Sequence, residues 1–492
     1  MTLYHRLHSN LSYQTLPSLF YSKTSLTPTL CPKLIAWNEP VAQQLGLHQL
    51  NIDQIQQIFS GNQKLENSEY LALAYAGHQF GHFVPQLGDG RAVLLGTFLD
   101  TNGQPFDIQL KGSGPTEFSR GGDGRSPLGP VLREYLISQA MEAFNIPTTR
   151  ALAAIATGQS IQRHQLSPGG VLTRVAKSHI RIGTFEYAAV YGGTNMVKKL
   201  ADYVIERHFP DLRHTSAPYQ ALLEKIISLQ ANLIAKWMSV GFIHGVMNTD
   251  NSAISGETLD YGPCAFMDEY HPETVFSSID RFGRYRYENQ PHIAQWNLGR
   301  LAEALMDLLG TTSTEGITIA NTLLAEFQPQ YQQAWYHLML QKIGLQDQCV
   351  DNHTLVDDLL TLMQQTQSDF TNTFIGLTHW LDPEKNHQPW LNGLLLTHPQ
   401  WHDWLARWQT QLSKQTISQH RLLAQLRQTN PVMIPRNHLV EQAIDAAEHD
   451  ANFEPFNKLL KAVTNPYQIP VQQAYTMPPT DKQKIRRTFC GT

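Results

Sequence analysis

Two short segments near the middle of the chain contain side chains that suit a divalent metal ion. HGVMNTDN runs from residue 244 to 251 and ends in Asp250 and Asn251, and LDYGP, at 259–263, contains Asp260. A carboxylate and an amide oxygen on neighbouring loops suit Mg²⁺, which takes oxygen ligands and keeps several of its waters. Such an ion commonly bridges phosphates. The two segments therefore predict metal-assisted chemistry on a phosphate compound, with Asn251 and Asp260 as the metal ligands.

A lysine and a glutamate upstream have the placement of a phosphate-holding ion pair. The segment FDIQLK (106–111) alternates apolar and polar residues, so Lys111 ends a predicted strand on its polar face. A helix is predicted from Val131 to Phe144, directly after Pro130, with Glu134 opposite its buried face. That face is predicted to consist of Leu132, Leu136, Ala140 and Ala143. A strand lysine held by a helix carboxylate can place its ammonium on nucleotide phosphates, although such a pair alone is also typical of a protein surface.

These residues follow one another in the order of the protein-kinase signature. That signature contains a glycine-rich loop, a strand lysine, a helix glutamate, a catalytic-loop asparagine and a metal-binding aspartate. QLGDGRA supplies Gly88 and Gly90, where backbone N–H groups can approach a phosphate, and a hairpin turn is the alternative. Counted from His244, the asparagine position falls on Asn251, and Asp260 begins the Asp-Tyr-Gly that matches the metal-binding triplet.

One catalytic group of a kinase is missing from this pattern. The aspartate that accepts the proton of the substrate hydroxyl would fall on Val246, which has no proton-accepting group. Asp250 is the nearest carboxylate able to take its place, and a turn or capping role is the alternative. The sequence therefore predicts a kinase-like site with altered chemistry.

A long loop and further cations accompany the site. GSGPTEFSRGGDGRSPLGP, between Lys111 and Glu134, is rich in glycine and carries Arg120, Asp123 and Arg125. Long loops in compact domains are usually functional or disordered. Arg174, in the predicted strand VLTRVAK, and Arg181 add fixed charges whose guanidinium forks match phosphate oxygens. A surface salt bridge is the alternative for each arginine.

The elements that position these residues change character along the chain. Short strands predicted at 91–99, 106–111 and 171–177 surround the helix that carries Glu134. A helical stripe then leads to Gly241, formed by Leu222, Ile226, Leu229, Leu233 and Trp237. Beyond Pro291 the pattern is almost wholly helical, and Trp401, Trp404 and Trp408 are predicted core residues. We expect an α+β fold with a strand-rich region at 1–182, the catalytic and metal loops at 183–330, and a helical region at 331–492.

Composition excludes several classes of protein. The 492 residues include 37 Lys and Arg against 42 Asp and Glu, a formal charge of −5 without charge blocks, which argues against a nucleic-acid partner. Apolar runs stay shorter than the about 18 residues of a membrane span. The start MTLYHRLHSNLSYQ does not read as a secretory signal, and the four cysteines lack metal-site spacing. We expect a cytoplasmic protein that does not bind membranes.

The chain resembles the selenoprotein O family of pseudokinases over nearly its whole length. The resemblance rests on YAGHQFGHFVPQLGDGRA (75–92), DIQLKGSGPTEFSRGGDGR (107–125), the two central loops, and TNPVMIPRNHLVEQAI (429–444). It implies a two-lobed, protein-kinase-like fold with a strand-rich N-lobe, a helical C-lobe and a helical C-terminal extension. It also implies that ATP binds flipped relative to a kinase, so that AMP passes to a Ser, Thr or Tyr hydroxyl of a protein, itself included, and pyrophosphate leaves.

The same resemblance implies a role for each site residue. Nucleotide contacts are implied for Gly88, Gly90, Arg91, Lys111, Asp123, Gly124, Arg174, Arg181 and Asp260. Lys111, Arg174 and Arg181 would hold the leaving pyrophosphate, and Glu134 would form the ion pair with Lys111. Asn251 and Asp260 would hold Mg²⁺, with Mn²⁺ as the other candidate, and Asp250 would accept the proton.

Other functions stay open at this point. A protein kinase would differ only in the phosphate that is attacked, and Val246 argues against it. A nucleotide-binding scaffold without turnover is a second alternative, against which Asn251 and Asp260 argue. A zinc pair of His78 and His82, four residues apart, is a third, but the glutamate of a zinc-protease motif is missing. Some family members carry selenocysteine near the C-terminus, where this chain has Cys490, and a redox role for it, with Cys264 as one candidate partner, is a hypothesis.

Overall fold

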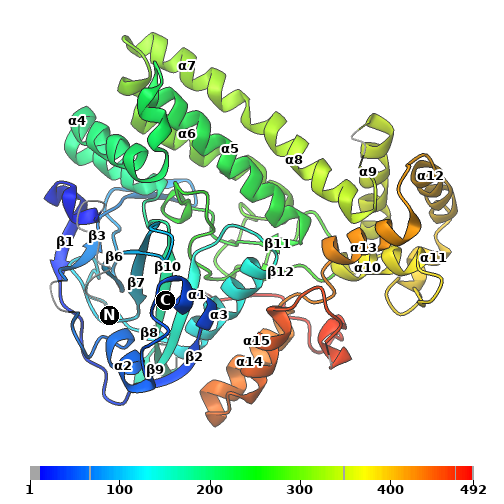
Figure 1. Ribbon diagram of the computed structural model, residues 1–492, viewed down its shortest axis with the longest axis horizontal. Coiled ribbons are helices and arrows are strands. Elements are labelled where there is room, and N and C mark those ends of the chain that lie inside the picture. Colours follow the sequence, from blue (N-terminus) through cyan, green and yellow to red (C-terminus); the bar gives the residue numbers. More distant parts are fainter. Residues whose placement is uncertain (1–11, 66–67, 164, 347–348, 471, 490–492) are drawn as a thin grey trace.

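The computed structural model describes residues 12–65, 68–163, 165–346, 349–470 and 472–489 (Figure 1). The architecture is mixed α/β. An antiparallel sheet forms the N-terminal part of the molecule, and helices form most of the remainder. Cys490 lies outside the described residues.

The main sheet has the strand order β1-β3-β6-β7-β10-β9-β2, with β8 paired to β10. Its strands are β1 Tyr21–Thr24, β2 Lys33–Trp37, β3 Tyr70–Leu73, β6 Ala92–Leu99, β7 Pro105–Lys111, β8 Ser126–Pro127, β9 Arg150–Gln162 and β10 Leu166–Ala176. Two small hairpins stand apart from it: β4 Gly77–Gln79 with β5 His82–Val84, and β11 Phe242–Ile243 with β12 Ala265–Phe266. The three strands predicted from the sequence are confirmed as β6, β7 and the second half of β10.

The two faces of this sheet have different partners. Ile108 and Leu110 of β7 join a core that contains residues of α1 (Glu39–Gln44) and α2 (Ile52–Phe59). Because strand side chains alternate, Gln109 and Lys111 lie on the other face, and Arg174 of β10 pairs with Gln109 in register. The alternation predicted for β7 thus places Lys111 and Arg174 on one polar face of the sheet.

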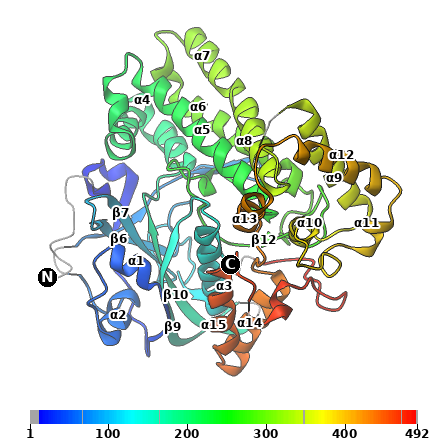
Figure 2. The same ribbon diagram turned by 45° about the vertical axis from the view of Figure 1, so that its right-hand side comes forward.

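Helix α3 (Leu128–Ala143) carries Glu134 and differs from the amphipathic helix expected. It begins before Pro130 instead of after it, and it is buried around almost its whole circumference. The cause is a late segment of the chain, since α14 (Asn437–Asp450) and α15 (Glu454–Val463) pack on its outer side (Figure 2). Arg133 forms an ion pair with Glu441, and the N–H of Gly129 donates to Glu448 Oε1 at 2.6 Å. Helix α3 is therefore held between the sheet, where Glu134 pairs with Lys111 and Arg174, and the C-terminal helices.

The remaining helices form most of the rest of the molecule, and the first two of them contact the central loops. They are α4 Ile182–His208, α5 Pro218–Ser239, α6 Gln290–Leu309, α7 Ser313–Ala325, α8 Phe327–Lys342, α9 Val350–Gln365, α10 Phe370–Trp380, α11 Gly393–Thr397, α12 Trp401–Ser413 and α13 Gln419–Thr429. Helices α5 and α8 lie side by side (Figure 1). The stripe predicted on α5 is buried apart from Leu229, which is half-buried. Trp401, Trp404 and Trp408 are confirmed core residues, stacked 5.3 and 5.4 Å apart. Among the described residues, no helix has both the length and the apolar character needed to cross a bilayer.

Candidate active site

Four charged side chains from separate elements meet between the sheet and the central loops. Lys111 Nζ of β7 lies 2.8 Å from Glu134 Oε2 of α3 and 2.5 Å from Asp260 Oδ1. Arg174 of β10 bridges the same two carboxylates, with Nε 2.5 Å from Glu134 Oε1 and Nη2 2.6 Å from Asp260 Oδ1. The predicted pairing of Lys111 with Glu134 is therefore present, and it is part of a larger cluster.

The charges in this cluster stabilise one another. Burial opposes ionisation of Asp260, but Lys111 and Arg174 outweigh it and hold the pKa of Asp260 well below its usual range. The same balance lowers the pKa of Glu134, with Arg174 as its strongest cation. Arg91 also contributes to lowering the pKa of Asp260, which places its guanidinium near the cluster. Two buried cations thus share two ionised carboxylates. The same cations can form charge-assisted hydrogen bonds with phosphate oxygens in place of carboxylate oxygens.

The loop that follows β11 brings Asp250 and Asn251 to the same region. Burial raises the pKa of Asp250 to about 7, and the nearby charge of Arg181 opposes this only in part. Asp250 Oδ1 is buried and has no hydrogen-bond partner among the described residues, whereas Oδ2 accepts from Gln79 Nε2 at 3.5 Å. Asn251 Nδ2 donates to the carbonyl of Val246 at 3.0 Å, so its amide oxygen is the atom left to face a ligand.

Asp260 occupies an unusual backbone conformation. Its φ of +64° lies in the left-handed region, which residues other than glycine rarely adopt. His244 begins the loop that contains Asp250 and Asn251, at the position that begins the catalytic loop of a kinase. It connects that loop to the segment of Asp260, because His244 Nε2 lies 3.2 Å from the carbonyl of Leu259. The His244 ring also stacks on Trp237 of α5 at 5.3 Å. Strained residues persist where surrounding structure holds them, and they cluster at functional sites.

Comparison with known proteins gives a single family. A family model described as "Protein adenylyltransferase SelO" matches residues 4–464. A protein from Agrobacterium fabrum (strain C58 / ATCC 33970) named protein nucleotidyltransferase YdiU is 50% identical over 484 residues, 98% of this chain and 99% of that protein. Proteins of the same name from Rhizobium meliloti (strain 1021) and Bacillus cereus (strain B4264) are 51% and 48% identical over 98% of this chain, covering 98% and 97% of their own lengths. The chain belongs to the SelO family of protein adenylyltransferases. It is thus a nucleotidyltransferase that uses ATP and acts on proteins.

Arg181 of this SelO-family protein lies beside Asp250 and not within the four-residue cluster. Its Nη1 donates to the backbone carbonyl of Asp250 at 3.0 Å, and its guanidinium lies 4.1 Å from the centre of the Tyr75 ring. Its Nη2 is buried without a hydrogen-bond partner among the described residues, 3.8 Å from Asp89 Oδ1. A buried guanidinium with a free donor is suited to an anionic ligand.

The segment with Gly88 and Gly90 is a tight connection packed on the long loop. A Cβ at Gly88, where φ is +71°, would lie 2.2 Å from the Phe118 ring, and one at Gly90 would lie 2.8 Å from the Phe118 carbonyl. The N–H groups of both glycines bond within the protein, to the carbonyls of Tyr75 at 3.2 Å and of Gly88 at 2.9 Å. Close packing therefore explains the two glycines, and the charge of Arg91, the next residue in the chain, contributes to lowering the pKa of Asp260.

Asp123 and Gly124 lie in the long loop, away from the charged cluster. Asp123 is exposed and pairs with Arg163, whose Nη1 and Nη2 lie 2.9 and 2.8 Å from its two oxygens, and this contact lowers the pKa of Asp123. Gly124 has φ +64°, and a Cβ there would lie 2.1 Å from the backbone of Gly114. The structure thus brings together Lys111, Glu134, Arg174 and Asp260, with Arg91 nearby, and leaves Asp123 in a separate ion pair.

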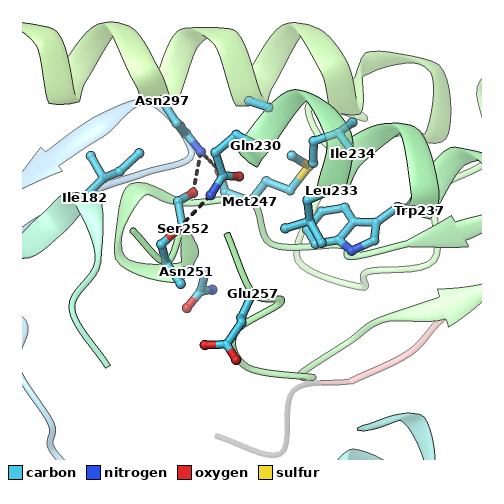
Figure 3. Close-up of a pocket in the computed structure, with 12 residues that line it drawn as sticks. Ile182, Gln230, Leu233, Ile234, Trp237, Met247, Asn251, Ser252, Glu257 and Asn297 are labelled. Atoms are coloured by element: carbon cyan, nitrogen blue, oxygen red, sulfur yellow. Dashed lines mark hydrogen bonds between the residues drawn. The ribbon is translucent and has the colours of Figure 1, made fainter. Parts of the chain in front are cut away.

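A small cavity behind Asn251 shows how the helices hold the catalytic loop (Figure 3). Asn297 Nδ2 of α6 donates to the carbonyl of Met247 and to Ser252 Oγ, both at 3.0 Å. Gln230 Nε2 of α5 donates to the carbonyl of Ala253 at 2.8 Å. The cavity is about 10 Å³, enough for a single water and far too small for a nucleotide. Glu257 also lines it, and burial raises the pKa of Glu257 to about 7.

The two histidines considered as a zinc pair have separate surroundings. His78 Nδ1 is hydrogen-bonded to Glu186, while His82 is exposed. Throughout the described ranges, no group of three or more His, Cys, Asp or Glu side chains is placed to hold a metal ion. Cys264 is fully buried, and burial raises the pKa of its thiol to about 12, which makes it a poor nucleophile.

Sequence reasoning missed the residues that touch Asp250 from outside its own loop. Gln79 and Gly77 of β4 lie next to its carboxylate. Glu186 of α4 is hydrogen-bonded to His78, which lies between them in β4, and to Thr249, which precedes Asp250. The available signal was the motif YAGHQFGHF, which is too polar and glycine-rich for an ordinary buried hairpin.

Proposed function

We propose that this protein joins AMP from ATP to a Ser, Thr or Tyr hydroxyl of a protein, itself included, and releases pyrophosphate. The observation that carries the proposal is the convergence of Lys111 and Arg174 on Asp260 Oδ1. The cations on the sheet can bind phosphates, and the carboxylate on the loop can bind a metal ion. A kinase-like, two-lobed arrangement accords with this site, with an N-lobe at 1–182, a C-lobe at 183–330 and a helical extension at 331–492.

The nucleotide is proposed to replace carboxylate oxygens as the partner of the cations. One oxygen of Asp260 receives both Lys111 and Arg174 in the structure. When the outer phosphates of ATP arrive beside the sheet, both cations can turn to them, and Arg91 and Arg181 add further charge. Four cations near the outer phosphates favour departure of pyrophosphate, because they stabilise the negative charge that develops on it.

Asn251 and Asp260 are proposed to hold Mg²⁺, with Mn²⁺ as the other candidate. The donors fit a hard ion, since the Nδ2 bond to the Val246 carbonyl does not use the amide oxygen of Asn251, and Asp260 is ionised. A bound Mg²⁺ would neutralise charge on the phosphates. Removal of divalent metal with a chelator is therefore expected to stop transfer.

Transfer is proposed as an in-line displacement at the α-phosphorus. The hydroxyl oxygen of the protein forms a bond to this phosphorus, and the bond from phosphorus to the oxygen that bridges to the β-phosphate breaks. The hydroxyl proton passes to Asp250, whose Oδ1 has no competing hydrogen bond, and pyrophosphate leaves with the electron pair of the broken bond. Positioning and charge neutralisation supply most of the rate, and proton removal supplies a smaller part.

ATP labelled on either the α- or the γ-phosphate tests this function. The purified protein is incubated with Mg²⁺ and labelled ATP, and label is followed into protein while pyrophosphate release is measured. Label from the α position alone, with equal release of pyrophosphate, is expected. Label from the γ position would make the protein a kinase despite Val246, and bound ATP without any transfer to a range of proteins would favour a scaffold.

We place the reaction in the cytoplasm. In the described part of the chain the thiols of Cys31, Cys264 and Cys349 are unpaired, which accords with a reducing setting. Detection of the protein in the soluble fraction of fractionated cells, with a cytoplasmic marker, tests this placement.

A further inference from the structure

The hairpin of β4 and β5, which belongs to the YAGHQFGHF motif, lies directly on Asp250. Gln79 Nε2 donates to Asp250 Oδ2 at 3.5 Å. Gly77 leaves room for the other oxygen, since a Cβ at this position would lie 2.6 Å from Asp250 Oδ1. One strand of three residues therefore donates to one oxygen of the proposed proton acceptor and, through a glycine, leaves space for the other. The hairpin itself must be fixed if this contact is to orient the carboxylate.

A closed ring of hydrogen bonds fixes the hairpin to the catalytic loop and to α4. The N–H of His78 donates to Thr249 Oγ1 at 2.7 Å, and Thr249 Oγ1 donates to Glu186 Oε2 at 2.5 Å. Glu186 Oε1 is hydrogen-bonded to His78 Nδ1, which closes the ring. Thr249 directly precedes Asp250 in the chain, so the ring holds the backbone on one side of the catalytic carboxylate.

The members of the ring are themselves held in place by their surroundings. The Glu186 side chain is only 5% exposed, so both of its oxygens depend on these two partners. The His78 ring lies against Trp296 at 5.2 Å and Phe83 at 5.0 Å. The neighbouring N–H of Phe80 donates to Asn248 Oδ1 at 3.1 Å, a second attachment of the hairpin to the catalytic loop.

We propose that His78, Glu186 and Thr249 are positioning residues for transfer: their ring holds the β4–β5 hairpin so that Gln79 anchors one oxygen of Asp250 and the other stays free to take the proton. The proposal rests on the proposed function, in which Asp250 is the base. Displacement of a reacting group by about 1 Å can lower the rate about 100-fold. Because the ring positions the base and does not contact the nucleotide in this proposal, its loss should lower turnover and leave nucleotide affinity unchanged.

Thr249→Val removes the central hydroxyl of the ring with little change in shape, and Thr249→Ser retains that hydroxyl. We expect Thr249→Val to lower kcat for AMP transfer about 10- to 100-fold while KM for ATP changes less than about twofold, and Thr249→Ser to stay near the wild type. Thr194→Val is the matched control, because it makes the same substitution at a threonine of α4 that also donates to a carboxylate. Thr194 Oγ1 donates to Asp307 Oδ2 at 2.5 Å and has no part in the ring. It should leave kcat unchanged.

A double-mutant cycle separates positioning from a general loss of structure. In an Asp250→Asn background the ring has no base to orient, so Thr249→Val should cost less than about twofold there. His78→Phe, which keeps the aromatic packing and removes Nδ1, should show the same dependence on Asp250. Thermal unfolding of each variant reports whether it is folded.

The outcomes distinguish this proposal from the proposed function. Full kcat for Thr249→Val, or an equal loss with and without the Asp250 carboxylate, would overturn the positioning role while leaving AMP transfer intact. Wild-type transfer by Asp250→Asn alone would overturn Asp250 as the base, and the positioning role with it.

Discussion

Asp250, the carboxylate proposed to accept the proton, has surroundings unlike those of an ordinary aspartate. Burial raises its pKa from 3.8 to about 7, and the charge of Arg181 and the hydrogen bond from Gln79 offset only part of that rise. A general base acts in its ionised form, and kcat/KM reports the ionisation of groups in the free enzyme. With a pKa of about 7, the ionised fraction grows from about 0.1 at pH 6 to about 0.9 at pH 8.

We therefore expect kcat/KM for ATP to rise about tenfold between pH 6 and pH 8 and to level off above that. The assay is the initial rate of label transfer from α-labelled ATP into protein, at ATP concentrations below KM and with Mg²⁺ in constant excess. Asp250→Asn should lower the rate about 10²- to 10⁴-fold and remove the rise, apart from any titration of ATP that both proteins share.

A second carboxylate near the loop provides the matched control. Burial also raises the pKa of Glu257 to about 7, and it lines the cavity behind Asn251. Since Glu257 has no part in the proposed proton transfer, Glu257→Gln should keep the tenfold rise. The reasoning is refuted if the rise is centred below about pH 5.5, if Asp250→Asn keeps it, or if Glu257→Gln abolishes it.

Further expectations concern stability, packing and the charged cluster. Burial raises the pKa of Glu257 from 4.5 to about 7, so the free energy of unfolding should fall by about 3 kcal/mol as pH rises from 4.5 through 7. Urea unfolding at pH 5 and pH 8 should show most of this fall in the wild type. The fall should be smaller in Glu257→Gln. Gly88→Ala places a Cβ 2.2 Å from the Phe118 ring at a positive φ, so it should destabilise the fold by about 1–3 kcal/mol in thermal unfolding, and an unchanged melting temperature would contradict that contact. Lys111→Ala and Asp260→Ala should each abolish transfer of α-label while circular dichroism stays native, and wild-type transfer by either would remove that residue from the site.

The local pattern of the sequence predicted the elements that carry the charged cluster. Alternation in FDIQLK predicted Lys111 on the polar face of β7, and the kinase-like order of residues predicted its pairing with Glu134; both are present, and Asp260 joins the pair. The helix that carries Glu134 was expected to bury one face, yet it is buried around almost its whole circumference. The difference arises because α14 and α15 cover that helix, and no periodicity within residues 131–144 can reveal a partner segment some 300 residues away.

Contacts between distant segments were the part that local patterns could not supply. The family resemblance implies a nucleotide contact for Asp123, and its carboxylate pairs in the structure with Arg163, from the connection between β9 and β10. His78 and Glu186 are separated by 108 residues, and Glu186 lies in a helix whose sequence gives no sign of a polar partner. Both contacts depend on how sheet, loop and helix are assembled, which the spacing of residues does not encode.

The covering of α3 by α14 and α15 also bears on when the enzyme becomes competent during its synthesis. Protein chains emerge N-terminus first, and regions fold as their partners become available. The strands that hold Lys111 and Arg174 are complete by residue 176, but the outer side of the helix that holds Glu134 has no cover until residues 437–463 have been made. Until then Tyr135, which contacts Phe456 in the finished protein, faces water. A chain shortened before residue 437 would thus leave the outer side of α3, the helix that carries Glu134, without its covering helices.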